Sequence, residues 1–197
     1  TRGGLGYGFK QYGMSYDGTP YTGSGSGNGF IYSVAPTVTP SLTGTTSKVY
    51  DGTTAASLTP ANFATTGALD NDTIVLDNPA VGTYGDKNAG SGKSVSATVG
   101  FVSAYSGVPS VPVYGYQFAA VTTASGNIGQ INAAPLTVSA QSDTRGYDGT
   151  VVSSVAPVVS GTLYDTVGTA AIQTYDPRNT GTGKTLTASG LVVNDGN

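Results

Sequence analysis

Oxygen-bearing side chains cluster between residues 70 and 78 of the sequence. Asp70, Asp72 and Asp77 lie there beside two asparagines. Carboxylate and amide oxygens are the ligands that Ca²⁺ prefers, so this segment is a candidate calcium site. The alternative is that Asp and Asn act as ordinary turn residues, because both bond to the local backbone. The related segment around Asp165 keeps a single acid and no calcium-binding loop motif is present, so we expect turns and no cofactor.

Two glycine-rich segments resemble the end of a phosphate-binding loop. Residues 90–94 read Gly-Ser-Gly-Lys-Ser, and residues 181–185 read Gly-Thr-Gly-Lys-Thr. A phosphate-binding loop needs Gly-x-x-x-x-Gly-Lys-Ser/Thr between a strand and a helix, since its backbone N–H groups cradle the phosphates. Lys87 and Arg178 stand where the first glycine is required. The alternating residues 94–99 also favour a strand, so we predict glycine-rich hairpins.

The residue types that are missing exclude most enzyme classes. The 197-residue chain contains no Cys, His or Trp, and its 11 acidic residues are all Asp. Without Cys and His, the sequence cannot build a thiolate zinc site, a cysteine nucleophile or a serine–histidine–aspartate triad. Two opposed Asp carboxylates could serve a glycosidase, but no Asp pair recurs in that way. We therefore predict that the chain is not an enzyme.

Lysines lie close to Asn and Asp in several places, which is the composition of a spontaneous Lys–Asn crosslink. The three lysines concerned are Lys48, Lys87 and Lys93. Such a bond needs a buried lysine, and buried lysine is rare. Arg145 and Arg178 replace lysine at two of the three related positions, so the crosslink is the less favoured interpretation.

Tyrosine is the most abundant aromatic residue, with 13 copies. Four of them recur in phase and are predicted to pack within the fold: Tyr50, Tyr84, Tyr147 and Tyr175. Three others do not recur and are the candidates for a surface contact: Tyr12, Tyr16 and Tyr21. Exposed aromatic rings bind sugars and are enriched at protein interfaces.

The low charge of the chain argues against one class of partner. The net charge is −3 and only 10% of residues are charged, which argues against nucleic-acid binding, since that needs clustered Lys and Arg. No apolar run approaches the ~20 residues of a membrane-spanning helix, so no membrane span is expected.

The elements that position these residues are predicted to be strands. Apolar residues make up 38% of the chain, enough for a core, and Val, Thr, Tyr and Ile favour strands. Residues 73–76, 94–99, 111–114 and 134–140 carry apolar residues between turn signals. The predicted fold class is all-β, built as tandem small β-sandwich repeats.

An internal repeat organises the chain. Residues 48–53 (Lys-Val-Tyr-Asp-Gly-Thr) recur as residues 145–150 (Arg-Gly-Tyr-Asp-Gly-Thr). Residues 67–74 and 83–94 also recur, in the same order, as 161–167 and 174–185. The predicted organisation is listed here: residues 1–35, the back part of a preceding repeat; 36–134, a complete repeat; and 135–197, the front part of a following repeat. We expect a window on a longer tandem array, or a subunit whose open end the next subunit completes.

These motifs together resemble the YDG repeats of large bacterial surface proteins. The resemblance rests on the Lys/Arg-x-Tyr-Asp-Gly-Thr start, the Gly-x-Gly-Lys-Ser/Thr centre and the Ala-Pro-Leu-Thr-Val joint at residues 134–138. Its repeat-defining residues are Tyr50, Asp51, Gly52, Tyr147, Asp148 and Gly149. Such repeats accompany mostly-bacterial Ig-like repeats in filamentous-haemagglutinin-like adhesins and two-partner-secretion exoproteins. The resemblance implies Ig-like β domains stacked into an extracellular stalk, without catalysis.

The leading functional hypothesis is a structural repeat of an extracellular or cell-surface bacterial fibre, with other copies of itself as partners. Such repeats would assemble end to end by tandem stacking or by strand complementation. The alternative hypothesis is a binding module that recognises a glycan or host protein through its Tyr-rich or loop surfaces.

Overall fold

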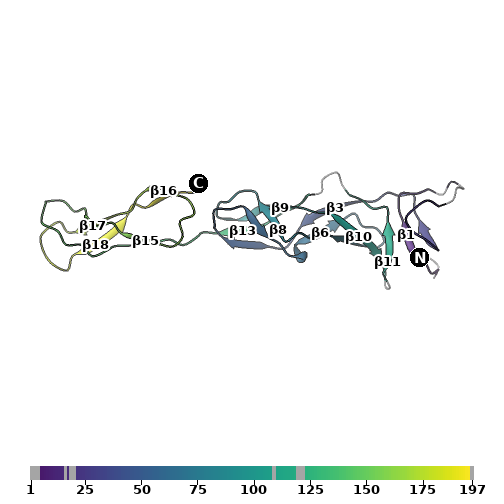
Figure 1. Cartoon of the computed structure of the whole chain (residues 1–197), viewed down its shortest axis with the longest axis horizontal. Helices are drawn as coiled ribbons and strands as arrows, with labels where there is room; N and C mark the ends of the chain where they lie inside the picture. The colour runs from purple at the N-terminus through teal and green to yellow at the C-terminus, as the bar shows by residue number, and fades with distance from the viewer. Residues whose placement is uncertain (1–4, 16, 18–20, 108–109, 119–122, 196–197) are drawn as a thin grey trace. The chain divides into compact units, whose positions relative to one another are not determined.

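The structure is a computed structural model, and it describes residues 5–15, 17, 21–107, 110–118 and 123–195 (Figure 1). Strands dominate these residues, and the described part of the chain has a single short helical turn, the 3₁₀ helix η1 (Pro60–Asn62), and no α-helix. The prediction of an all-β fold is confirmed. Among the described residues, no helix is long and apolar enough to cross a membrane.

The chain forms two compact units. The first unit comprises residues 1–47, 54–86 and 91–130. The second unit comprises residues 48–53, 87–90 and 131–197, so it takes in two turns that the sequence places in the first complete repeat.

Two sheets of the first unit contain the N-terminal strands. The larger one has the order β2 (Gly29–Ile31), β1 (Phe9–Gln11), β11 (Val111–Tyr114), β10 (Phe101–Ser106) and β7 (Thr73–Leu76). Strand β1 runs parallel to both β2 and β11, whereas β10 is antiparallel to its neighbours. The smaller one has the order β12 (Gln117–Phe118), β3 (Thr37–Leu42) and β6 (Phe63–Thr66).

A third sheet has five strands, and β13 (Thr123–Asn132) lies next to one of its edges. The order of this sheet is β4 (Thr46–Val49), β13, β9 (Gly90–Thr98), β8 (Val81–Tyr84) and β5 (Ala55–Ser57). Strand β13 therefore fills the space between β4 and β9. The predicted strands over residues 73–76, 94–99 and 111–114 are confirmed by β7, β9 and β11.

The described residues of the second unit form three antiparallel strand pairs. They are β14 (Thr137–Ser139) with β15 (Val158–Ser160), β16 (Thr166–Thr169) with β19 (Val192–Asn194), and β17 (Ile172–Asp176) with β18 (Thr185–Ser189). Strands β15, β16, β17 and β18 are labelled in Figure 1. The register repeats that of the first unit: Tyr84 lies opposite Val95 in β8–β9, and Tyr175 lies opposite Leu186 in β17–β18. Residues 135–195 thus retrace the strand pairing of the first repeat.

The buried apolar side chains are unevenly distributed along the chain. Within the described residues, all of them lie before position 132, for example Val38, Tyr84, Val95 and Ile131. Between residues 133 and 195 the one buried residue is Gln173. The second repeat segment has strands like those of the first but a much thinner core.

Candidate functional site

The Tyr-Asp-Gly-Thr motif of the first repeat forms a stapled turn. The Asp51 carboxylate accepts hydrogen bonds from the Thr53 backbone N–H at 2.9 Å and from the Thr53 hydroxyl at 2.8 Å. The Lys48 ammonium donates to the same carboxylate and to the Thr53 carbonyl, each at 2.7 Å. Gly52 has a φ of +75°, which glycine adopts at no steric cost. The Lys48 bond, with those of Thr53, lowers the pKa of Asp51 to about 2.

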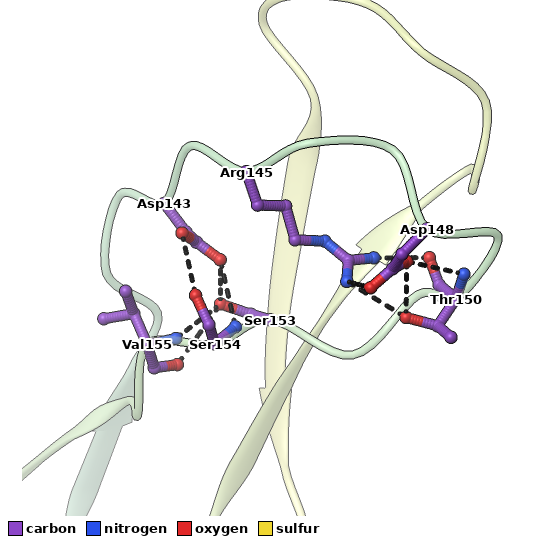
Figure 2. Close-up of polar contacts among 7 residues, drawn as sticks. All are labelled: Asp143, Arg145, Asp148, Thr150, Ser153, Ser154 and Val155. Carbon is purple, nitrogen blue, oxygen red and sulfur yellow. Dashed lines mark hydrogen bonds and ion pairs between the residues drawn. The ribbon is translucent and has the colours of Figure 1, made fainter.

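The second copy of the motif is built in the same way, with arginine in place of lysine. Asp148 accepts from the backbone N–H and the hydroxyl of Thr150, each at 2.9 Å, and from the Arg145 guanidinium at 2.7 Å (Figure 2). Gly149 has a φ of +77°. The Thr150 bonds lower the pKa of Asp148. The motif is therefore a local turn whose residue types follow from the contacts each one makes.

Tyr50, the first residue of the Tyr-Asp-Gly motif, also takes part in a cluster of polar side chains in the second unit. Its hydroxyl donates a hydrogen bond to the Asp165 carboxylate, and the Lys87 ammonium donates to the other oxygen of that carboxylate. The Tyr50 ring meets the Tyr164 ring edge to face, with centroids 6.1 Å apart. The Lys87 bond lowers the pKa of Asp165, and the bond to Asp165 raises the pKa of Tyr50. We call Tyr50, Lys87 and Asp165 the Asp165 cluster.

The first unit contains a buried cluster of the same composition. The Lys10 ammonium donates to one oxygen of Asp72, and both side chains are fully buried. The hydroxyls of Tyr12 and Tyr116 donate to the other oxygen at 3.1 and 3.0 Å. Burial raises the pKa of both tyrosines, and the Asp72 carboxylate adds to the effect. Lys10, Tyr12, Asp72 and Tyr116 form the Asp72 cluster.

The two clusters occupy related positions in the repeat. Asp72 directly precedes β7 and Asp165 directly precedes β16, and the repeat alignment pairs these two acids. Each acid accepts from one lysine and at least one tyrosine hydroxyl. In both cases the lysine belongs to an earlier repeat segment than the acid. The arrangement can hold successive segments together, and none of these contacts forms a nucleophile–base pair.

The candidate calcium ligands are engaged by protein groups. Lys10 contacts Asp72 and also Asp70, the latter at 3.4 Å. Asp77 accepts from the Gly100 backbone N–H at 2.9 Å. Over the described residues, no group of three acidic side chains is close enough to hold a metal ion. An ammonium group thus stands where the calcium hypothesis would place the cation.

The prediction of a surface contact is wrong for Tyr12. Only 2% of its surface is exposed, because its ring packs against Tyr32 and Tyr116 and its hydroxyl bonds to Asp72. Tyr21 is half-buried and stacks on Phe9, with centroids 5.3 Å apart. Tyr16 lies outside the described residues.

The first glycine-rich segment forms part of a strand, and the three candidate crosslinking lysines form ion pairs. Gly90 begins strand β9, so no helix follows the Gly-x-Gly-Lys-Ser sequence. Lys48 pairs with Asp51, Lys87 with Asp165, and Lys93 with Asp86.

The tyrosines that recur in phase differ in how much of their surface is exposed. Tyr84 is 2% exposed and packs as predicted. Tyr147 is 63% exposed, although its counterpart Tyr50 is half-buried. The reason is that Tyr50 packs on Tyr164 and Asp165, which come from the following repeat segment.

Lys10 and Gln173 are two of the buried polar residues that the sequence does not predict. Lys10 recurs nowhere in phase and no motif marks it. Gln173 donates to the Gln141 carbonyl at 2.9 Å and accepts from the Gln141 backbone N–H at 2.7 Å. A polar residue between Ile172 and Thr174 gives no signal of burial by its type.

Comparison with known proteins identifies one family. Residues 34–106 match the YDG domain family. The matched segment includes the first stapled turn and Asp72, and it ends with β10. This match supports the sequence-based assignment of the repeat. No curated protein and no solved structure matches the chain.

Proposed function

We propose that this chain is a structural repeat of an extracellular bacterial fibre or adhesin stalk, in which successive repeats hold one another end to end. The observation that carries the proposal is the pair of Asp clusters. In each, an acid that precedes a strand accepts from a lysine and a tyrosine of an earlier segment. The two acids occupy matching repeat positions, whereas the lysines and tyrosines that bind them do not. Contacts between neighbouring repeats are what hold a tandem array together.

The proposal includes the finer fold, in which each repeat is a small Ig-like β-sandwich. The residues of the repeat 36–134 enter three sheets. Support comes from two of them, one that contains β3 and β6 and one that contains β4, β13, β9, β8 and β5. An experimental structure of the full chain would test it. Apolar contacts between the facing sides of these two sheets are expected, and a barrel closed by hydrogen bonds would contradict it.

The binding-module alternative gains no support from the aromatic residues. Tyr12 is buried, and Tyr21 is half-buried with one ring face stacked on Phe9, so Tyr12 presents no ring face to a sugar. We therefore place the self-association of repeats first.

Labelling of intact cells tests the proposed location. Antibodies raised against the chain should label unpermeabilised cells of the source bacterium, and external protease should abolish the signal. A cytosolic enzyme of the same cells serves as the control. Labelling that requires permeabilisation would refute the proposal.

A further inference from the structure

A groove in the second unit lies outside both Asp clusters. It has a volume of about 380 Å³, and residues 142–147 and 177–184 line it together with Thr150, Tyr175 and Leu186. Arg145 reaches across it, with its guanidinium carbon 5.2 Å from the centre of the Tyr175 ring. The stapled turn of the second repeat, shown in Figure 2, forms one wall.

In the first repeat, the corresponding place is filled by a strand. Residues 143–146 are the counterpart of β4, and β18 is the counterpart of the second half of β9. Strand β13 lies between β4 and β9 in the first repeat. Among the described residues of 135–195, no strand lies between the counterparts, and residues 143–146 are not in a strand.

In the first repeat, β13 needs a glycine where it contacts the side chains of β8 and β9. A Cβ atom at Gly129 would lie 2.4 Å from Cε1 of Tyr84 and 2.8 Å from Cγ2 of Val95. The β13 backbone therefore rests directly on these two side chains, which are 2% and 0% exposed. Their counterparts Tyr175 and Leu186 are half-buried and line the groove.

A buried hydroxyl marks the place where the strand contacts the site. The Tyr84 hydroxyl donates to the Gln130 carbonyl of β13 at 3.2 Å. The Tyr175 hydroxyl is likewise buried and makes no hydrogen bond of standard geometry among the described residues. Burial and the nearby Asp143 carboxylate, which also lines the groove, raise the pKa of Tyr175. A strand placed as β13 is in the first repeat would bring a backbone carbonyl to this hydroxyl.

A backbone N–H group at the stapled turn also bonds to β13 in the first repeat. The Tyr50 N–H donates to the Asn132 carbonyl of β13 at 2.7 Å. Its counterpart Tyr147 lines the groove and is 63% exposed. A strand in the groove would therefore continue past Tyr175 to the stapled turn.

We propose that this groove is a strand-acceptor site, and that its occupant is a strand of the β13 type. The occupant is extended, places a glycine on Tyr175 and Leu186, and offers a carbonyl to the Tyr175 hydroxyl. This is β-augmentation, in which backbone hydrogen bonds give affinity and side-chain contacts give specificity. The inference rests on the proposed function, because a β13-type strand is part of a repeat of this kind.

A peptide titration tests the proposal. The full chain is titrated with a synthetic peptide of residues 123–133 and followed by calorimetry and by amide hydrogen exchange. We expect saturable binding and slowed exchange at residues 143–147 and 183–186. The matched control is the same peptide with Gly129→Val, which should bind at least about tenfold more weakly because its side chain meets the Tyr175 ring.

Two chain variants locate the contact. Tyr175→Phe should weaken peptide binding about fivefold, the value expected for one neutral hydrogen bond. Tyr164→Phe removes a hydroxyl of the same unit outside the groove and should leave binding unchanged. Absence of binding, equal binding of the Gly129→Val peptide, or protection elsewhere in the chain would each overturn the proposal.

The outcome separates this inference from the proposed function. Cell-surface labelling does not depend on the groove, so labelled cells and a peptide that fails to bind would refute the acceptor site alone. A peptide that binds to a chain absent from the cell surface would refute the proposed location and leave the site standing.

Discussion

Replacing Asp72 with alanine should strongly destabilise the first unit. The substitution leaves the fully buried Lys10 ammonium with Asp70 as its remaining carboxylate, 3.4 Å away and on a side chain that is 45% exposed. Removing one partner of a buried ion pair typically costs about 3–5 kcal/mol. The hydroxyls of Tyr12 and Tyr116 also lose their acceptor. We expect a loss of about 3–5 kcal/mol in the free energy of unfolding.

Urea unfolding measures this loss. Tyrosine fluorescence and circular dichroism are suitable probes, because the chain has 13 Tyr and no Trp. With an m-value of about 2 kcal/mol per M, the midpoint of the first unit should fall by roughly 1.5–2.5 M. The matched control is Asp86→Ala, which removes a carboxylate that is 57% exposed from its pair with Lys93. The Lys93 side chain is 11% exposed, but because the carboxylate that is removed lies in solvent, we expect a loss of about 0–1 kcal/mol.

A double variant checks the physical reason. Lys10→Met combined with Asp72→Ala should be less destabilising than Asp72→Ala alone, because no unpaired charge is then buried. If Asp72→Ala is as mild as Asp86→Ala, or if the double variant is the worse of the two, the argument from the buried charge is refuted.

Three further outcomes are expected. The contacts of Asp51 lower its pKa from 3.8 to about 2. The stability that the ionised carboxylate contributes is therefore present above pH 3.8 and is lost as the pH falls through 2. Asp51→Asn should flatten the pH dependence of the free energy of unfolding in that window. Gly149→Ala should cost about 1–2 kcal/mol because the φ of this residue is +77°, whereas Gly146→Ala, which meets no atom within 4 Å, should be near neutral in urea unfolding. Gln173→Leu should lower the stability of the second unit by about 1–3 kcal/mol, since it leaves the Gln141 backbone groups unpaired; an unchanged unfolding midpoint would contradict this.

The sequence predicts the strands well where the local pattern decides the structure. The alternation at residues 94–99 and the apolar run at 73–76 become β9 and β7. The Tyr-Asp-Gly turns also follow from residue type, because Asp51 and Thr53 bond within the turn itself. In these segments the interactions that stabilise the structure lie within a few residues of one another.

The clusters could not be predicted, because their partners are far apart in the sequence. Lys10 and Asp72 are separated by a long stretch of chain, and nothing in their spacing indicates contact. The same distance explains the error at Tyr12: a tyrosine without a repeat counterpart suggests a surface role, but Asp72 and Tyr116 draw it into the interior. Tyr147 shows the converse, because its exposure depends on a neighbour and not on its own motif.

The unequal burial of the two Asp clusters has a mechanical consequence. Lys10 and Asp72 are both fully buried, whereas the Lys87 side chain in the Asp165 cluster is 33% exposed. Water and salt reach the exposed pair and screen it, so a pulling force should break it first. The rate of forced unfolding is set by the barrier at the point that yields. Within the fibre that we propose, the Asp165 cluster should therefore open at a lower pulling force than the Asp72 cluster.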